Sequence, residues 1–188
     1  MKILKLIVSG TALVLVIPFT AQVRYGGMQQ AGLSYNESGT SAHLSVINGI
    51  RFGRYFTGIG ADPSFESFRY RTIALYADGR YYIDSNKRFF AKVNAGVNLI
   101  TQKLHSDNYW YWPEMRTNHY RKQPGFHGVI GIGYKARLGK EVFYSFDLSF
   151  GFTQMRYTVS YINFLNEKQI ERYDLRRTAI VLHLGFEV

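Results

Sequence analysis

Residues 142–152 read Val142-Phe-Tyr-Ser-Phe-Asp-Leu-Ser-Phe-Gly-Phe152, with a large apolar side chain at every second position. The intervening positions hold Phe143, Ser145, Asp147, Ser149 and Gly151. Because successive side chains of a β-strand point to opposite faces, this period of two predicts a strand with one apolar face and one mostly small or polar face.

The same period recurs along the chain and predicts an all-β fold. It is clear in residues 71–83, 89–99, 126–138 and 178–186, and weaker in 28–36, 42–52 and 55–61. With residues 142–152 these segments make eight strands. The dipeptides Asn48-Gly49 and Asp78-Gly79 favour two-residue turns. Cutting there would leave fragments of about five residues, so we expect both strands to continue.

The connections between these strands alternate in length. Short ones lie at residues 51–54, 84–87 and 138–141, longer ones at 62–70, 102–124 and 158–172, and a modest one at 37–41. All short turns then fall at one end and all long loops at the other. An even number of antiparallel up-and-down strands with this asymmetry is typical of transmembrane β-barrels. Crossing a bilayer at a tilt takes about 9–11 residues per strand, as predicted here.

The volume of an eight-stranded barrel predicts which face points inward. Its interior is just wide enough to be filled by side chains or to hold one small ligand. The bulky apolar face would overfill that space, so we expect it to point outward into lipid. The alternative is a soluble, secreted, lipocalin-like binding barrel with its apolar face inside.

Composition excludes several classes of protein. The chain has 188 residues, 46% hydrophobic and 16% aromatic, which excludes a disordered or collagen-like polymer. No cysteine is present, so a disulfide framework, a thiolate metal site and a cysteine nucleophile are also excluded. Lys and Arg exceed Asp and Glu by 23 − 13 = 10, so the chain is basic.

Residues 1–22 have the features of a cleaved secretory signal peptide. Lys2 and Lys5 precede an uncharged apolar run over residues 6–17, and small residues follow it. The run is too short for a membrane-spanning helix, which needs about 20 apolar residues. We therefore expect residues 23–188 to form a single exported barrel domain.

Aromatic residues gather toward both ends of the predicted barrel, where Tyr and Trp suit the lipid–headgroup boundary. Those toward the short-turn end are Tyr25, Phe52, Tyr55, Tyr81, Phe89, Tyr144 and Phe186. Those toward the long-loop end are Tyr35, Phe68, Tyr70, Tyr109, Trp110, Tyr111, Trp112, Phe126, Phe152, Tyr157 and Tyr173.

These features resemble the small outer-membrane β-barrel family of the OmpA/OmpX kind. Residues 47–52 followed by 55–60 are similar to the second and third strands of such proteins. The resemblance implies a Gram-negative outer-membrane location and contact with the outer-membrane assembly machinery. Barrels of this kind commonly end on an aromatic residue, whereas this sequence ends Phe186-Glu187-Val188.

Charged residues at inward positions predict a polar network in the lumen. They are Asp78, Arg80, Lys92, Lys135, Arg137, Asp147, Arg177, His183 and Glu187. Because an isolated buried charge costs several kcal/mol, we expect these groups to pair and fill the barrel. A proton or ion path is the alternative. A general porin is not expected, since eight strands leave no wide aqueous channel.

An enzyme is not expected, nor is any cofactor or metal. An outer-membrane lipid-modifying enzyme, an acyltransferase or deacylase, is the alternative, and it would need a nucleophile and base near the outer rim. Candidates by position are His43, His105, His119, His127, Ser41, Ser106, Asp107 and Glu114. No Gly-x-Ser-x-Gly motif occurs.

The long loops are the candidate binding surface. Residues 102–124 carry Tyr109, Trp110, Tyr111, Trp112, Arg116, His119, Arg121 and Lys122. Such a set suits lipopolysaccharide headgroups, phosphorylated sugars or a protein partner, while export argues against nucleic acid. Exposed apolar residues in 158–172 indicate a hairpin extension or a partner surface. We expect a structural, adhesive or accessory role in the outer membrane.

Overall fold

The structure, a computed structural model, describes residues 23–37, 39–66, 70–103, 117–138, 142–162 and 167–187. The predicted signal peptide, residues 1–22, lies outside these ranges. In the described ranges no helix is long and apolar enough to cross a membrane. The strands are β1 (Arg24–Asn36), β2 (Gly39–Phe52), β3 (Tyr55–Glu66), β4 (Tyr70–Tyr82), β5 (Phe89–Lys103), β6 (Thr117–Gln123), β7 (Gly125–Arg137), β8 (Phe143–Ile162) and β9 (Lys168–Glu187).

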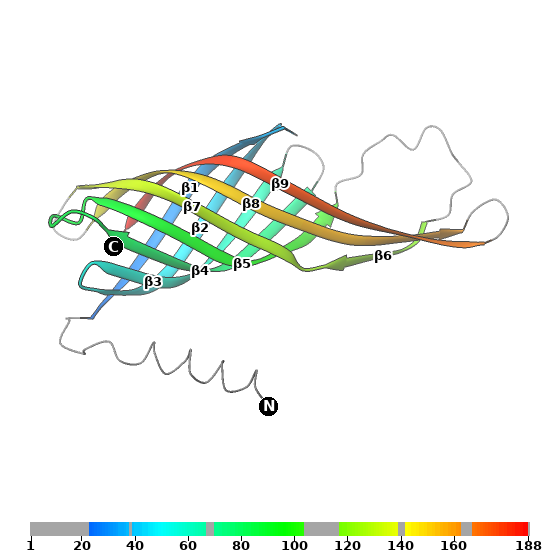
Figure 1. The fold of residues 1–188 in the computed structure, drawn as a ribbon, viewed down its shortest axis with the longest axis horizontal. Helices are drawn as coiled ribbons and strands as arrows, with labels where there is room; N and C mark the ends of the chain where they lie inside the picture. Colours follow the sequence, from blue (N-terminus) through cyan, green and yellow to red (C-terminus); the bar gives the residue numbers. More distant parts are fainter. Residues whose placement is uncertain are drawn as a thin grey trace, which may run out of the picture.

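Eight of these strands close into an antiparallel ring (Figure 1). Strands β1 to β5 pair in chain order, β5 pairs with β7, and β7, β8 and β9 continue the ring. Strand β9 returns to β1, from Met28↔Glu187 to Tyr35↔Ile180. The predicted eight-stranded up-and-down barrel is confirmed. Strands β2 and β4 also run unbroken through Asn48-Gly49 and Asp78-Gly79, as predicted.

Strand is present where three long loops were predicted, and in the first of them, 62–70, residues 62–66 belong to β3 and Tyr70 to β4. Strand β6 lies in residues 102–124, and residues 158–162 and 168–172 belong to β8 and β9. Only Pro124 separates β6 from β7, and β6 pairs with β8 beyond the ring. For residues 158–172 the hairpin extension that the sequence indicated is confirmed. The loop prediction was wrong because β8 supplies backbone hydrogen bonds to β6 and β9 beyond the lipid-facing part of the strands, where the apolar residues of β8 change from even to odd positions.

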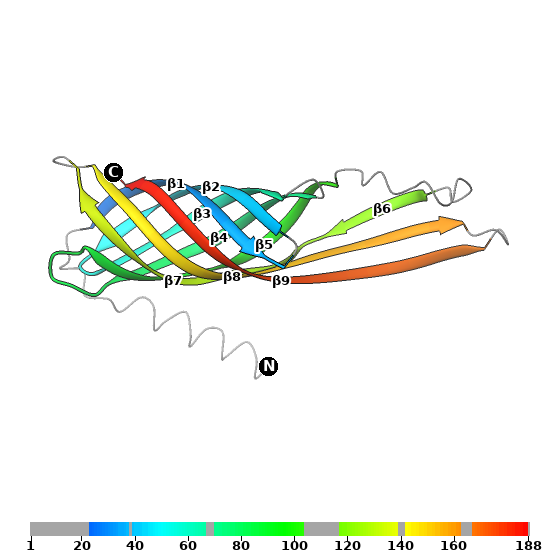
Figure 2. The same cartoon turned by 90° about the horizontal axis from the view of Figure 1, so that it is seen from above.

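Strands β6, β8 and β9 form a three-stranded sheet that extends past the ring (Figure 2). We call it the projecting sheet, and the end that carries it the projecting end. The opposite end holds the short connections β2–β3, β4–β5 and β7–β8 and is called the turn end. The predicted placing of short turns at one end is therefore confirmed.

The outer surface of the ring is apolar. Ile130 and Ile132 of β7 are 64% and 65% exposed, whereas Val129 and Lys135 are buried. Exposed apolar residues occur on every ring strand, including Leu33, Val46, Ile59, Leu75, Val93, Ile130, Leu148 and Leu182. The predicted outward apolar face is confirmed, and the lipocalin-like alternative is wrong, because such a barrel would bury this face.

Aromatic residues surround the turn end of this apolar band. Tyr55 packs on Tyr81 with ring centroids 5.2 Å apart, and Tyr144 packs on Phe186 at 4.7 Å. At the projecting end, Tyr157 and Tyr173 were predicted to join the second girdle. Instead they stack on each other at positions that continue the inward-facing set of β8 and β9, and Tyr157 is buried.

Tyr157 belongs to a small apolar cluster where the projecting sheet leaves the ring. Its other buried members are Ile100 and Met155, with Val159 and Leu175 packed against them. This cluster gives the first part of the projecting sheet a hydrophobic core of its own, which an isolated hairpin would lack.

The lumen holds large rings as well as polar groups. Met28, Ile47, Phe56, Tyr82 and Phe90 are buried inside it. Inward glycines leave room for some of these rings: a Cβ at Gly133 would lie 2.2 Å from the Phe90 ring. The sequence led us to expect mainly small and charged groups there.

Candidate functional site

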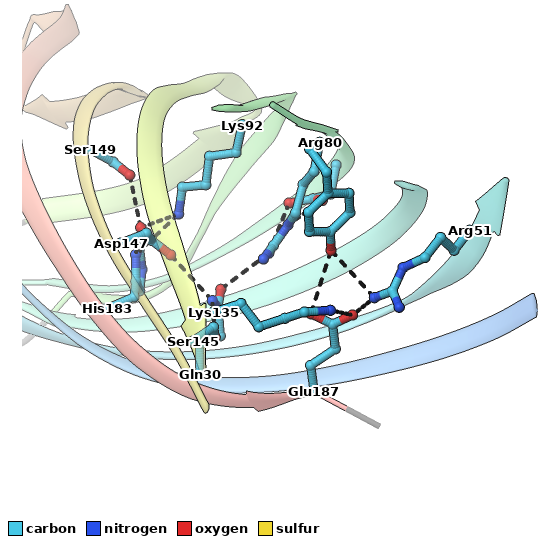
Figure 3. A network of polar contacts seen from close by, with 12 residues as sticks. Gln30, Arg51, Arg80, Lys92, Lys135, Ser145, Asp147, Ser149, His183 and Glu187 are labelled. Atoms are coloured by element: carbon cyan, nitrogen blue, oxygen red, sulfur yellow. Dashed lines mark hydrogen bonds and ion pairs between the residues drawn. The ribbon is translucent and has the colours of Figure 1, made fainter. Parts of the chain in front are cut away.

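The carboxylate of Asp147 collects partners from three other strands inside the lumen (Figure 3). Lys92 Nζ donates to Asp147 Oδ1 at 2.5 Å, and His183 Nδ1 lies 3.0 Å from the same oxygen. Ser149 Oγ donates to Oδ1 at 2.8 Å, and Gln30 Nε2 donates to Oδ2 at 3.2 Å. Strands β1, β5, β8 and β9 are thus tied together across the barrel.

Arg80 continues this network toward the turn end. Its Nε donates to Asp78 Oδ1 at 2.9 Å, and its Nη2 contacts Gln30 Oε1 at 3.5 Å. The guanidinium also lies over two rings, 5.1 Å from the centroid of Phe90 and 5.9 Å from that of Phe56. The charge is therefore neutralised by a carboxylate and flanked by aromatic faces.

Glu187, on the last strand, holds a third group near the turn end. Lys135 Nζ donates to Glu187 Oε1 at 3.1 Å, and the guanidinium of Arg51 pairs with the same oxygen. The Tyr82 hydroxyl donates to Oε2 at 3.5 Å. These contacts connect β9 to β2, β4 and β7 (Figure 3).

Seven of the nine residues predicted for the lumen lie in these three groups. They are Asp78, Arg80, Lys92, Lys135, Asp147, His183 and Glu187, all buried. Arg137 is exposed, because it is the last residue of β7 and lies beyond the lumen at the turn end. Arg177 is half-buried at the projecting end and does not join the three groups.

Sequence reasoning missed four members of the network, Gln30, Arg51, Tyr82 and Ser149. Arg51 and Tyr82 stand beside predicted turns, at positions that the two-residue period assigns to the inward face. That period alone could have identified both as lumen residues. Nothing in the sequence shows that Gln30 connects Asp147 to Arg80 across the barrel, because that contact depends on how the ring closes.

A small chamber of about 50 Å³ lies in the lumen toward the projecting end. Its lining includes Ser34, Asn36, His43, Asp62, Asn98, His127, Arg177 and His183. Such a volume holds a few water molecules. Within the described residues, His127 Nδ1 and His183 Nε2 have no hydrogen-bond partner although both are buried. Both belong to side chains that line the chamber, so we expect water to bind there.

Three chamber residues have the order of a nucleophile, a base and an orienting acid. Ser34 Oγ lies 2.7 Å from His43 Nε2, and His43 Nδ1 lies 3.3 Å from Asp62 Oδ1. Ser45 Oγ donates to the other oxygen of Asp62 at 3.0 Å. The sequence had placed His43 near Ser41, but the fold brings it to Ser34 instead. Ser34 is two residues from the end of β1, close to the projecting rim.

Much of the predicted loop site lies outside the described residues, namely Tyr109, Trp110, Tyr111, Trp112 and Arg116, with His105, Ser106, Asp107 and Glu114. The backbone of His119 is part of β6. Arg121 is exposed on the same strand, and Lys122 donates to the carbonyl oxygen of Thr101. The structure therefore separates Arg121 from Lys122, which point to opposite faces of β6.

No protein-family model matches the sequence, and no curated protein matches it. Among solved structures, the chain is similar to outer membrane protein OprG from Pseudomonas aeruginosa, with a TM-score of 0.57 at 9% identity, covering 87% of this chain and 95% of that one. The fold is that of an outer-membrane β-barrel. The barrel is also similar to Neisserial surface protein A, with a TM-score of 0.46 at 10% identity, covering 88% and 96%.

At sequence identities this low, the similarity to solved structures supports only a statement about the fold. The kinship with the OmpA/OmpX kind stays a prediction. In the described part of the barrel, no three His, Asp or Glu side chains are grouped to hold a metal ion.

Proposed function

We propose that the protein is an integral barrel of the Gram-negative outer membrane, exported by a cleaved signal peptide at residues 1–22. The exposed apolar band supports this, because water would not solvate a continuous surface of Leu, Ile, Val and Phe. The aromatic pairs at its turn end suit a lipid–headgroup boundary. The fold shared with OprG agrees with it.

In this proposal the lumen is a structural plug. Ion pairs at Asp147 and Glu187 and the Arg80–Gln30 hydrogen bond link the barrel walls, and aromatic rings fill the space between them. The carboxylates of Asp78, Asp147 and Glu187 each have a Lys or Arg partner, as a stable buried network requires. We accordingly expect no stepwise conductance from the protein in planar bilayers, and a structural, adhesive or accessory role in the outer membrane.

The projecting sheet is the proposed binding surface, for lipopolysaccharide, for a protein partner, or for both. The observation that carries this is its pairing pattern: residues 168–179 of β9 pair with β8 alone, and β6 also pairs with β8 alone in the described strands. Among the described strands neither edge has a further strand paired to it, and such an edge can add a strand from another chain.

A photocrosslinking amino acid in intact cells tests this surface. Placed at Arg121 on β6, it should give a discrete product of higher mass. Placed at Arg54 in the β2–β3 turn, it should give none of that mass. Absence of the product at Arg121, or the same product at both positions, would contradict a binding role for the projecting sheet.

The Ser34–His43–Asp62 geometry favours a second candidate, a lipid-modifying acyltransferase or deacylase. His43 would take the proton of Ser34 as Oγ attacks an ester carbonyl, then return it to the leaving alcohol as the C–O bond breaks. Water or a second alcohol would release the acyl group by the reverse steps. Asp62, held by Ser45, would keep Nδ1–H of His43 oriented.

A fluorophosphonate probe separates this candidate from the structural role. An active serine should be labelled in the folded barrel, and Ser34→Ala should abolish labelling. Ser41→Ala is the matched control, since Ser41 is also a buried serine and pairs with Ser34 in the β1–β2 register. No labelling of the native protein would rule the candidate out.

A further inference from the structure

Four arginines share one face of the projecting sheet. Strand pairing places Arg121 and Arg172 on either side of Thr158, and Arg156 opposite Asp174. Arg176 lies two residues from Asp174 on the same face of β9. All four arginine side chains are exposed. We call Arg121, Arg156, Arg172 and Arg176 the arginine face.

This face continues the lipid-facing side of the barrel. The even-numbered positions of β8 and β9 face outward in the ring, where Phe150 and Ile180 are 53% and 58% exposed. Phe152 and Thr178, and beyond them Arg156 and Arg176, also stand at even-numbered positions and therefore lie on the same side of the strands. The arginines therefore point sideways from the projecting sheet, toward whatever lies next to the barrel.

Their height places Arg176 at the level of the lipid headgroups and Arg156 just above that level. Arg176 and Arg156 follow the Phe152–Thr178 row by two and four residues. At about 3.3 Å per residue these steps are about 7 and 13 Å along the strands. A strand tilt of about 40° reduces them to about 5 and 10 Å above the apolar band. The headgroup layer next to the hydrocarbon core is about 5–8 Å thick.

The charge of this face is strongly unbalanced. Asp174 is the one acidic residue on this face of the described strands β6, β8 and β9. Gln154 Nε2 already donates to both of its oxygens, at 2.7 and 3.0 Å, and Arg176 lies 3.5 Å from it. Within the described strands, the excess positive charge thus has no matching carboxylate on this face. Arginine binds phosphate through paired N–H donors.

We propose that the arginine face binds the phosphate groups of an outer-leaflet glycolipid that carries two phosphates. This deepens the proposed function and rests on it. Arg121 and Arg172 stand two strands apart, about 10 Å at 4.8 Å per strand, with Arg156 and Arg176 below them. Arginines spread this widely can contact two separated phosphates at once, whereas a single phosphate would contact only some of them. This spacing favours a diphosphorylated sugar headgroup over a phospholipid.

Binding of diphosphoryl lipid A to the detergent-folded full chain tests the site. The double variant Arg156→Gln/Arg172→Gln should bind about 25-fold more weakly, because each arginine near a charged lipid surface contributes about a fivefold factor. Asp174→Asn should bind more tightly than the native protein, since it removes the one opposing charge. The matched control Arg54→Gln/Arg88→Gln, at the turn end, should bind like the native protein.

Three results would overturn the proposal. They are equal lipid A binding by the native protein and the Arg156/Arg172 variant, an equal loss in the Arg54/Arg88 control, and binding of phosphatidylglycerol or inorganic phosphate as tight as that of lipid A. A mobility shift on heating in SDS gels shows that each variant is folded. Failure of the proposed membrane location appears separately, as native protein absent from the outer-membrane fraction.

Discussion

Asp147 shows at the residue scale how the lumen depends on complete pairing. Its carboxylate neutralises the buried ammonium of Lys92 and also accepts from Ser149 and Gln30. Asp147→Ala should lower the free energy of unfolding in urea by about 3–5 kcal/mol, because it leaves Lys92 charged and unpaired.

The double variant Asp147→Ala/Lys92→Met is the control for this prediction. It removes both charges, so it should recover a substantial part of the stability lost in the single variant. If the single and double variants unfold at the same urea concentration, the Asp147–Lys92 pair is not what stabilises the lumen.

Gly133 tests the fit between inward glycines and rings. A Cβ at Gly133 would meet the Phe90 ring at 2.2 Å, whereas a Cβ at Gly79 meets nothing closer than Val93 at 3.5 Å. Gly133→Ala should therefore lower the free energy of unfolding by about 1–3 kcal/mol. Gly79→Ala should change it far less. Equal effects of the two substitutions would contradict close packing at Phe90.

Asp84, in the β4–β5 turn, should make local stability depend on pH. Slight desolvation raises its pKa, but backbone N–H bonds from Phe89 and Arg88, both 2.7 Å, outweigh this and lower it. Because the pKa of Asp84 is lower in the folded state, its ionised carboxylate stabilises the turn at pH values above the unfolded pKa, about 3.9. That stability is lost as pH falls through the folded value.

Hydrogen exchange at the Arg88 and Phe89 amides measures this effect. In the native protein, exchange corrected for its intrinsic pH dependence should show the turn opening more as pH falls below about 4. In Asp84→Asn the pH-dependent part should disappear. A pH response that persists unchanged in the variant would exclude Asp84 as its cause.

The odd or even position of a residue in its strand predicts most of the residues that face the lumen, but not which of them contact one another. The two-residue period places Asp78, Arg80 and Lys92 inside without any knowledge of the fold. It cannot pair Gln30 with Asp147, or Ser34 with His43, because those partners come from strands whose relative register is set by the turns and by ring closure.

At the scale of the element, the projecting sheet is where sequence patterns gave least guidance. Beyond the lipid band the outward face no longer needs to be apolar. From Arg156 to Tyr161 the apolar residues stand at odd, inward positions instead of even ones, and residues 168–172 show no regular alternation. Pairing with β8 and packing on Met155 and Tyr157 stabilise these segments instead. Both features depend on contacts between distant parts of the chain.

The projecting sheet should be removable without loss of the barrel. Because Arg156 and Asp174 are paired, residues 157–173 can be replaced by an Asn-Gly turn. The shortened protein should still shift in mobility on heating in SDS gels, since the ring pairing of β1 with β9 is untouched. A shortened chain that no longer folds would show that the projecting sheet is part of the barrel's core.

At the scale of the whole molecule, the direction in which the apolar face points decides whether the barrel belongs in a membrane or in water. The burial pattern of β9 alternates from Ile180 to Glu187, with Leu182 and Leu184 exposed and His183 buried. Eight strands with this pattern make an apolar cylinder around a polar interior. Such a cylinder is stable in a bilayer and insoluble in water.

The absence of native cysteine allows the direction to be measured with single spin labels. Cysteines placed one at a time at residues 180–184 of the bilayer-reconstituted protein would be labelled and tested for collision with oxygen and with a water-soluble nickel complex. We predict high oxygen accessibility at residues 180, 182 and 184, and low accessibility to both reagents at 181 and 183. High nickel accessibility at 180, 182 and 184 would contradict the membrane barrel.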